Sequence, residues 1–322
     1  ATDAQIGAAL VALRMKKETP EEIAGFAKAM REACNQIHPK VNGTLVDTCG
    51  TGGDKHKTIN VSTAAAVVIA AAGVPVAKHG NRAVTSKCGS ADILETLGFN
   101  INLEPTAVQK MIEEYNFGFM FAPNFHPAMK RVIAPRREIG VRTVFNILGP
   151  LTNPANAQAQ LMGVFDANLT EKIANVMKIL GIKRAMVVHG LDGLDEISTI
   201  GKTIITELNN GKIETHNIEP EDFGFERVSP KEIAALETPE LNAALLLKIF
   251  NNNTKGPKLD IILLNSAAAL VVGGLSEDIK EGIEISKNII ENGLAYQKLL
   301  EVIQASKGDS TKISSLESLP CG

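Results

Sequence analysis

Two neighbouring segments of the chain have the composition of an anion-binding site. The first is the turn Gly50-Thr51-Gly52-Gly53-Asp54, whose glycines let backbone amides point at a ligand with no Cβ in the way. The second segment gathers polar and basic donors over a short stretch: Lys78, His79, Asn81, Arg82, Thr85, Ser86, Lys87 and Ser90. Together they predict a pocket for a small molecule that carries several phosphate groups.

The sequence around these segments predicts elements that bring them together. Residues 45–49 have the β-branched content of a short buried strand, residues 62–72 form an apolar helix that ends at Gly73, and residues 74–77 form a second strand. The amino end of that helix, with its unpaired amides and positive dipole, would face the glycine turn. Parallel strands joined in this way open both turns at one edge of the sheet.

The glycine turn matches neither of two familiar phosphate motifs. A dinucleotide fingerprint that starts at Gly50 needs glycine where Lys55 stands, and a P-loop needs the same glycine followed by lysine and a hydroxyl residue. Glycine-rich turns between a strand and a helix are common, so the turn alone supports a structural role as well as a functional one. The donors of the second segment favour the functional interpretation, because few folds need them for stability.

A third segment, residues 189–196, predicts a magnesium site. It follows the predicted strand 185–188 and carries the carboxylates of Asp192, Asp195 and Glu196. Mg²⁺ usually takes one or two protein carboxylates and completes its shell with water and substrate phosphate. Alone, the segment is an ordinary acidic turn, but its expected place beside the phosphate turns favours a metal site.

Size and composition limit the class of protein. A chain of 322 residues with 44% hydrophobic residues fits one large domain or two modest ones. Its formal net charge of −3 argues against a nucleic-acid partner. The four cysteines lack metal-site spacing, and the longest apolar run, residues 64–77, is shorter than the ~20 residues of a membrane span. We therefore expect a soluble, cytoplasmic protein with reduced thiols and no membrane partner.

The remaining pattern alternates between helices and strands. Helices are expected over residues 2–15 and from 20 to about 37, in a small helical unit that later segments complete. From residue 160 onward, strands and helices alternate, which predicts a parallel, helix-covered sheet. Further expected elements are an amphipathic helix over 105–115, a brief extended segment at 101–103, a hairpin over 203–216 and three or four helices over 238–305.

Three further expectations concern irregular segments. A helix that starts near His126 is expected to be interrupted by Pro135, which would place the backbone of Arg136 unusually. Residues 145–154 are expected to form a rigid turn set by glycine and proline. The tail over 307–322 is polar and is expected to be disordered.

Five separated motifs, in unbroken order over nearly the whole chain, resemble those of anthranilate phosphoribosyltransferases, a family of the nucleoside phosphorylase type. They are Gly50–Asp54, Asn60–Thr63, Lys78–Arg82, Gly149–Pro154 and Asp195-Glu196. The resemblance implies an α/β fold with a small all-helical domain, a larger domain with a mainly parallel central sheet flanked by helices, and a homodimer. We expect the helical domain over 1–42 and 104–150, and the α/β domain over 43–103 and 151–322.

The resemblance also implies a reaction in tryptophan biosynthesis, in which anthranilate and 5-phosphoribosyl 1-diphosphate give N-(5-phosphoribosyl)anthranilate and diphosphate. The residues that it implies for the phosphoribosyl donor are Gly50, Gly53, Asp54, Thr58, Asn60, Val61, Ser62, Thr63, Lys78, His79, Gly80, Asn81, Arg82, Ala83, Val84, Thr85, Ser86 and Ser90. Anthranilate would be bound by Gly50, Asn81 and Arg136, and Mg²⁺ by Ser62, Asp195 and Glu196. Lys78 and Arg136 would stabilise the transition state and orient the substrates, with no general base.

The chain departs from the family pattern at three points. It begins at what corresponds to the second or third helix of the family, Cys88 stands where serine is usual, and Lys55-His56-Lys57 makes the glycine turn more basic. We hypothesise that the added lysines tighten phosphate binding.

The sequence leaves two alternative functions open. One is a pyrimidine nucleoside phosphorylase, which shares the fold. The other is a non-catalytic phosphoribosyltransferase-like protein that binds nucleic acid or a regulator. The presence of Arg136, Asn81 and the acidic pair, together with the net charge, speaks against the second.

Overall fold

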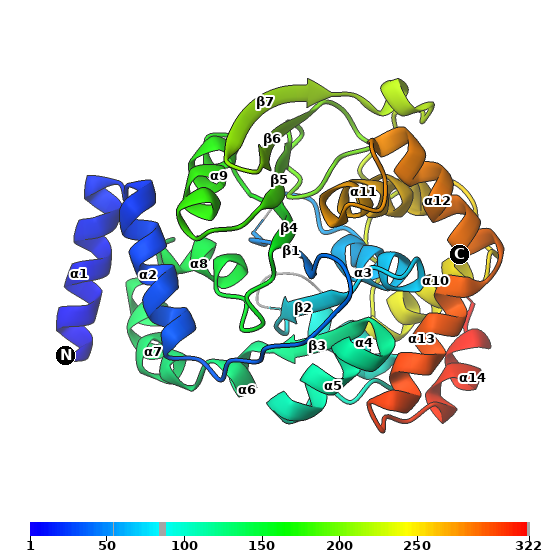
Figure 1. The fold of residues 1–322 in the computed structure, drawn as a ribbon, viewed down its shortest axis with the longest axis horizontal. Helices are drawn as coiled ribbons and strands as arrows, with labels where there is room; N and C mark the ends of the chain where they lie inside the picture. Colours follow the sequence, from blue (N-terminus) through cyan, green and yellow to red (C-terminus); the bar gives the residue numbers. More distant parts are fainter. Residues whose placement is uncertain (54, 84–87, 321–322) are drawn as a thin grey trace.

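A seven-stranded sheet runs through the middle of the molecule, and helices cover both of its faces (Figure 1). The structure is a computed structural model that describes residues 1–53, 55–83 and 88–320. In order across the sheet, the strands are β3 (Phe117–Phe121), β2 (Val76–Gly80), β1 (Val46–Gly50), β4 (Ala159–Gly163), β5 (Arg184–Gly190), β6 (Thr203–Asn209) and β7 (Lys212–Ile218). The strands from β3 to β5 pair in parallel, and β6 and β7 form the predicted antiparallel hairpin. The expected mainly parallel sheet flanked by helices is confirmed.

One face of the sheet carries the larger hydrophobic core. Its centre is formed by α3 (Val61–Ala71) and α11 (Pro257–Gly273), which are apolar almost all round and are therefore buried. No helix in the described part of the chain, α11 included, is long and apolar enough to cross a membrane. The outer layer on this face consists of α4 (Ser90–Thr96), α10 (Pro239–Phe250), α12 (Ile279–Glu291), α13 (Leu294–Ala305) and α14 (Thr311–Glu317).

The opposite face packs against α9 (Leu169–Ile179) and a group of helices at one end of the molecule (Figure 1). In this group α1 (Asp3–Lys16) packs on α7 (Lys130–Ile139), and α2 (Pro20–Glu32) packs on α8 (Phe145–Leu151). Thr2 and Thr19 begin α1 and α2 with capping boxes, which satisfy the first amides of each helix. Short connecting elements complete the fold: α5 (Pro105–Tyr115), α6 (Ala122–Phe125), η1 (Pro127–Met129) and η2 (Pro220–Phe223).

Several predicted boundaries were wrong. Helix α2 ends at Glu32 rather than near residue 37, and residues 101–103 form no strand. Pro135 does not interrupt α7, because it is buried and removes a single backbone hydrogen bond, so the helix continues to Ile139. The expected rigid turn over 145–154 begins instead as α8, with Pro150 in its last turn.

Two larger segments also differ from expectation. Residues 117–121, expected in the helical domain, form β3 and pair with β2 at the edge of the sheet, because this apolar run is buried at every position. The tail that was expected to be disordered contains α14, whose Ile313 and Leu316 are buried. These two residues are spaced to lie on one helical face, and that face packs onto the main core.

The contact between α11 and α12 predicts a measurable stability difference between two glycine variants. A Cβ added at Gly282 would lie 2.8 Å from the backbone of Ala267, whereas one added at Gly25, within α2, would meet nothing within 4 Å. Gly282→Ala should therefore lower the free energy of unfolding by about 1–3 kcal/mol, because backbone has to move. The control Gly25→Ala should raise it by about 0.5–1 kcal/mol. Urea unfolding checks both values, and equal shifts in the two variants would contradict the prediction.

Candidate active site

The carboxyl ends of β1 and β2 open onto a cavity of about 610 Å³, which the segment from α7 to α8 borders on the helical side. A crevice at the carboxyl ends of parallel strands is the usual ligand site of an open α/β sheet. The predicted residues found in its lining are Gly50, Gly53, Ser62, Lys78, His79, Gly80, Asn81, Arg82, Ala83, Ser90 and Arg136. The lining therefore joins the glycine turn, the basic segment and Arg136.

The acidic segment packs directly against the ends of β1 and β4. Gly50 and Gly163 are paired neighbours on these strands, and the Asp195 residue fills the space that their missing side chains leave. A Cβ at Gly50 would lie 2.4 Å from Asp195 Oδ2, and one at Gly163 would lie 1.5 Å from the Asp195 carbonyl oxygen. The amide of Gly52 donates to Asp195 Oδ2 at 2.7 Å. The glycine turn thus forms a seat for the carboxylate of Asp195.

Lys78 lies at the base of the site. The structure places Lys78, His79 and Gly80 within β2 rather than in the loop expected from the sequence. The Lys78 side chain is only 1% exposed, and its Nζ donates to the Thr48 carbonyl and, at 3.3 Å, to Ser62 Oγ in the first turn of α3. Burial lowers the pKa of Lys78, and the negative charges of Asp47 and Glu196 act to raise it. A cationic donor therefore links β1, β2 and the amino end of α3.

Asp47 and two histidines form a second buried polar group. Asp47 accepts hydrogen bonds from Asn153 Nδ2 at 2.8 Å and from the His79 amide at 3.3 Å. Burial raises the pKa of Asp47 to about 6, although the Lys78 charge acts to lower it. Burial also lowers the pKa of His79 to about 3, so this ring faces the pocket as a neutral imidazole. The ring of His126 lies beside it, with 4.9 Å between centroids.

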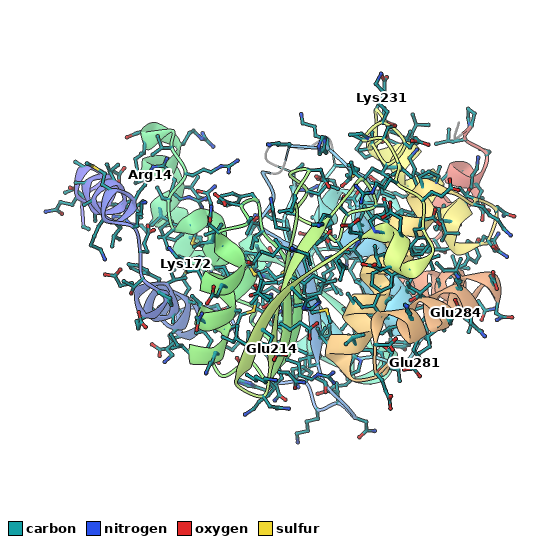
Figure 2. The ribbon with its side chains drawn as sticks, turned by 90° about the horizontal axis from the view of Figure 1, so that it is seen from above. Arg14, Lys172, Glu214, Lys231, Glu281 and Glu284 are labelled. Atoms are coloured by element: carbon teal, nitrogen blue, oxygen red, sulfur yellow. The ribbon has the colours of Figure 1, made fainter. Side chains whose placement is uncertain are left out.

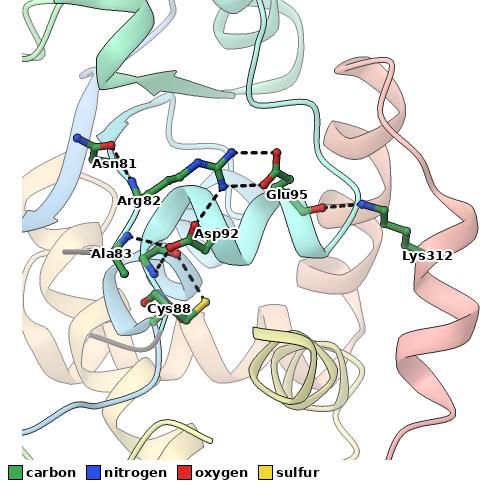
Figure 3. A network of polar contacts seen from close by, with 9 residues as sticks. Asn81, Arg82, Ala83, Cys88, Asp92, Glu95 and Lys312 are labelled. Carbon is green, nitrogen blue, oxygen red and sulfur yellow. Dashed lines mark hydrogen bonds and ion pairs between the residues drawn. The ribbon is translucent and has the colours of Figure 1, made fainter. Parts of the chain in front are cut away.

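The basic segment after β2 is held by carboxylates of α4 (Figure 3). Asp92 Oδ2 accepts hydrogen bonds from the amides of Ala83 at 2.8 Å and Gly89 at 2.9 Å, so one carboxylate binds both residues. The guanidinium of Arg82 donates to Glu95 and to Asp92. The hydrogen bonds that Arg82 donates to Glu95 and Asp92 raise its pKa. Arg82 therefore lines the pocket while anchored to α4.

Arg136 enters the pocket from α7. Its guanidinium lies over the ring of Phe145, 5.1 Å from the centroid, and burial lowers its pKa. A half-buried arginine on an aromatic face is well placed to bind a planar carboxylate, because the low local dielectric strengthens the ion pair.

The other predicted residues lie around this lining. Thr63 Oγ1 donates to Ser90 Oγ at 3.1 Å, Asn60 Nδ2 donates to the Cys88 carbonyl at 3.0 Å, and Val61 is buried. Thr58 forms an isolated β-bridge with Ala234. Four predicted residues lie outside the described part of the chain: Asp54, Val84, Thr85 and Ser86.

Of the residues predicted for Mg²⁺, Asp195 packs on the glycine turn and Ser62 lines the cavity. Among the described residues no group of three or more His, Cys, Asp and Glu side chains surrounds a common point. The chemistry of the donors nevertheless fits Mg²⁺, which needs few protein ligands when a phosphorylated substrate supplies others. Burial raises the pKa of Asp195, so a nearby cation would favour its charged form. The space left by Gly50 holds that carboxylate against the glycine turn.

Lys55 packs on the acidic segment. Its aliphatic stem lies across Gly193, where an added Cβ would come within 2.6 Å of Lys55 Cδ, and its amide donates to the Gly193 carbonyl at 3.1 Å. His56 Nε2 lies 3.2 Å from the Asp192 carbonyl oxygen. Both residues lie outside the described lining of the pocket. The basic residues therefore fasten the glycine turn to the acidic segment.

Sequence reasoning missed four residues near the cavity. Arg142, Phe145 and Phe165 line it, and His126 packs on His79 behind it. Arginine is common on protein surfaces and phenylalanine in cores, so no local pattern marks these residues. Only the fold brings them to the site.

Comparisons with known proteins agree with this architecture. Residues 1–34 match the helical bundle domain and residues 42–296 the a/b domain of a glycosyl transferase family. An anthranilate phosphoribosyltransferase of Methanococcoides burtonii is 52% identical, over 96% of this chain and 87% of its own. That of Acetivibrio thermocellus is 53% identical, over 94% of this chain and 87% of its own.

Solved structures show the same likeness. The enzyme of Thermus thermophilus superposes with a TM-score of 0.90 at 41% identity, over 95% of this chain and 91% of that chain. A Saccharomyces cerevisiae enzyme, described in complex with PRPP and Mg, gives a TM-score of 0.87 at 31% identity, over 95% and 85%. The chain is thus a two-domain glycosyl transferase. Within that class it belongs to the anthranilate phosphoribosyltransferase family.

The buried Asp47 predicts an unusual pH dependence of stability. The pKa of Asp47 is about 6 in the folded state, above its ordinary value of 3.8. Between these two pH values the folded state binds more protons than the unfolded state, so the free energy of unfolding falls as pH rises through 6. From pH 7 to pH 5 the wild type should gain about 1.4 kcal/mol of unfolding free energy relative to Asp47→Asn. Urea unfolding at both pH values measures this gain. The exposed control Asp309→Asn, whose carboxyl has a lowered pKa, should show no such gain.

Proposed function

We propose that this pocket is the active site at which the chain transfers the 5-phosphoribosyl group of 5-phosphoribosyl 1-diphosphate to the amine of anthranilate. The chain has the activity of its family, a step of tryptophan biosynthesis. The observation that carries the placement is that the glycine turn, Lys78 and Arg136 line a single cavity. One side of it is rich in donors for a polyanion, and the other presents a cation for a carboxylate.

The reaction needs charge stabilisation more than a base. The bond from the ribose C1 to the diphosphate oxygen breaks, the amine nitrogen of anthranilate forms the new bond to C1, and that nitrogen then loses a proton. The amine becomes acidic only as it bonds, so we assign no general base. Negative charge grows on the leaving diphosphate, and each donor aimed at it is typically worth a few kcal/mol. Lys78 and the amide of Gly53 are the proposed donors.

Anthranilate would bind on the helical side of the cavity. We assign its carboxylate to Arg136, whose guanidinium is supported by Phe145, with Gly50 and Asn81 completing the anthranilate set. Two parallel hydrogen bonds from guanidinium to carboxylate fix the ring plane as well as its position. A fixed ring plane would orient the amine toward the ribose. Such positioning of the two reactants contributes to the rate enhancement.

The complete donor set named from the sequence remains our proposal for 5-phosphoribosyl 1-diphosphate. Its residues beside the lining have a supporting role: Thr63 binds Ser90, and Asn60 binds the Cys88 carbonyl. Ser62, Asp195 and Glu196 would hold Mg²⁺. When bound, the ion offsets the charge of the diphosphate.

We also propose a cytoplasmic homodimer without nucleic-acid or membrane partners. The division into a helical domain over 1–42 and 104–150 and an α/β domain over 43–103 and 151–322 is part of the proposal. It is modified only for α5 and β3, since β3 pairs within the sheet and α5 packs on it.

The first test of the function is the fluorescence of anthranilate. It should fall when the protein, 5-phosphoribosyl 1-diphosphate and Mg²⁺ are all present, because the amine is converted to a ribosylated amine. EDTA in excess of Mg²⁺ should stop the change, and added Mg²⁺ should restore it. Persistent fluorescence under the complete conditions, with phosphorolysis of thymidine instead, would favour a nucleoside phosphorylase.

Arg136 gives a substrate-specific prediction. Arg136→Ala should raise the Michaelis constant for anthranilate by about 10- to 100-fold, because a charge-assisted hydrogen bond to the carboxylate is lost. The Michaelis constant for the phosphoribosyl donor should stay within about twofold, since the donor lies on the other side of the cavity. The control Arg137→Ala removes an exposed arginine of the same helix and should change neither constant. Equal changes in both constants would argue against the assignment.

A further inference from the structure

Arg142 lies at the border between the two halves of the cavity. It follows α7, which carries Arg136, and precedes α8, and its side chain is part of the lining. The carbonyl of Arg142 accepts a hydrogen bond from the guanidinium of Arg14 in α1. Figure 2 shows Arg14 at the helical end of the molecule, where α1 packs beside α7. The backbone of Arg142 is therefore fixed to the helical group.

The side chain of Arg142 extends to the α/β side. Its Nη2 donates to the carbonyl of Gly53 at 2.8 Å, and its guanidinium lies 4.2 Å from the centroid of the Phe165 ring. Stacking fixes the plane of a guanidinium, so its donors lose less freedom when they bind. Arg142 thus connects the helical group to Gly53, the last glycine of the glycine turn.

The same glycine turn is held at its other end by the segment after β4. Thr51 donates its amide to the Gly163 carbonyl at 3.0 Å, and Thr51 Oγ1 accepts the amide of Phe165 at 3.1 Å. Gly53 has a φ of +76°, and an added Cβ would lie 3.2 Å from Arg142 Nη2. The turn, the Phe165 segment and Arg142 therefore form one packed unit.

We propose that Arg142 is a positioning residue for binding of the phosphoribosyl donor. By donating to the Gly53 carbonyl, it fixes the backbone of the turn at Gly53, and Phe165 is the platform that makes this contact rigid. The inference rests on the proposed function, because it assumes that the turn binds the diphosphate. It assigns Arg142 no contact with anthranilate.

The test compares donor binding and turnover in three variants. Isothermal titration of 5-phosphoribosyl 1-diphosphate with Mg²⁺ gives Kd, and the fluorescence assay gives kcat and both Michaelis constants. Arg142→Ala should raise the donor Kd and its Michaelis constant about tenfold, with kcat within about threefold and the anthranilate constant within about twofold. Arg142→Lys, which keeps the charge but cannot stack as a plane, should raise them about threefold. Phe165→Leu should have a similar effect, about threefold.

The double variant decides whether the two residues act together. Because Phe165 acts through Arg142, the double variant Arg142→Ala, Phe165→Leu should have the same donor Kd as Arg142→Ala alone. Additive losses would overturn the proposal, as would a donor Kd within about twofold of the wild type in Arg142→Ala, or equal changes in both Michaelis constants together with a lowered Tm. The control Arg137→Ala should have the donor Kd and both Michaelis constants of the wild type. A wild type that binds the donor but turns over no anthranilate would instead count against the proposed function.

Discussion

The active site depends on a single steric requirement, the space left by two paired glycines at the ends of β1 and β4. Gly50 and Gly163 face each other across the strand pair, and Asp195 occupies the volume that two Cβ atoms would take. Without this approach the acidic segment could not rest on the glycine turn, and the amide of Gly52 could not reach Asp195. Glycine is therefore required at the end of β1 because the acidic segment packs against it.

The charges around that seat are costly for the fold. Lys78 and Asp47 are almost fully buried, and burial shifts both pKa values toward the neutral forms. Such groups are retained only if hydrogen bonds compensate part of the desolvation, as those of Thr48, Ser62 and Asn153 do here. An apolar pair would pack the same space more cheaply. A cation held in place beneath a polyanion site has a functional reason, because it needs no rearrangement when charge develops on the leaving group.

Much of this arrangement could be predicted from the sequence, and the failures have physical causes. The glycine turn, α3 and the antiparallel hairpin follow local rules of turn chemistry and apolar periodicity. Lys78 and His79 were assigned to a loop because strand propensity cannot show that a lysine is buried. Pro135 was read as a helix break and Pro150 as part of a turn, yet tertiary packing offsets the one hydrogen bond that each removes. Arg142 and Phe165 stand far apart in sequence, so only the parallel sheet and the position of α7 bring them together.

The helical group is part of the site because its segment from α7 to α8 contributes residues to both halves of the cavity. Arg136 is supported within that segment by Phe145, whereas Arg142 reaches across to Gly53 and Phe165. A displacement of α7 relative to the sheet would therefore move Arg136 and break the contact at Gly53 together. If the proposed assignments hold, binding of either substrate favours the arrangement that the other one needs, since both depend on the same position of the segment. The two arginines would then couple the two proposed substrate sites without a direct contact between the substrates.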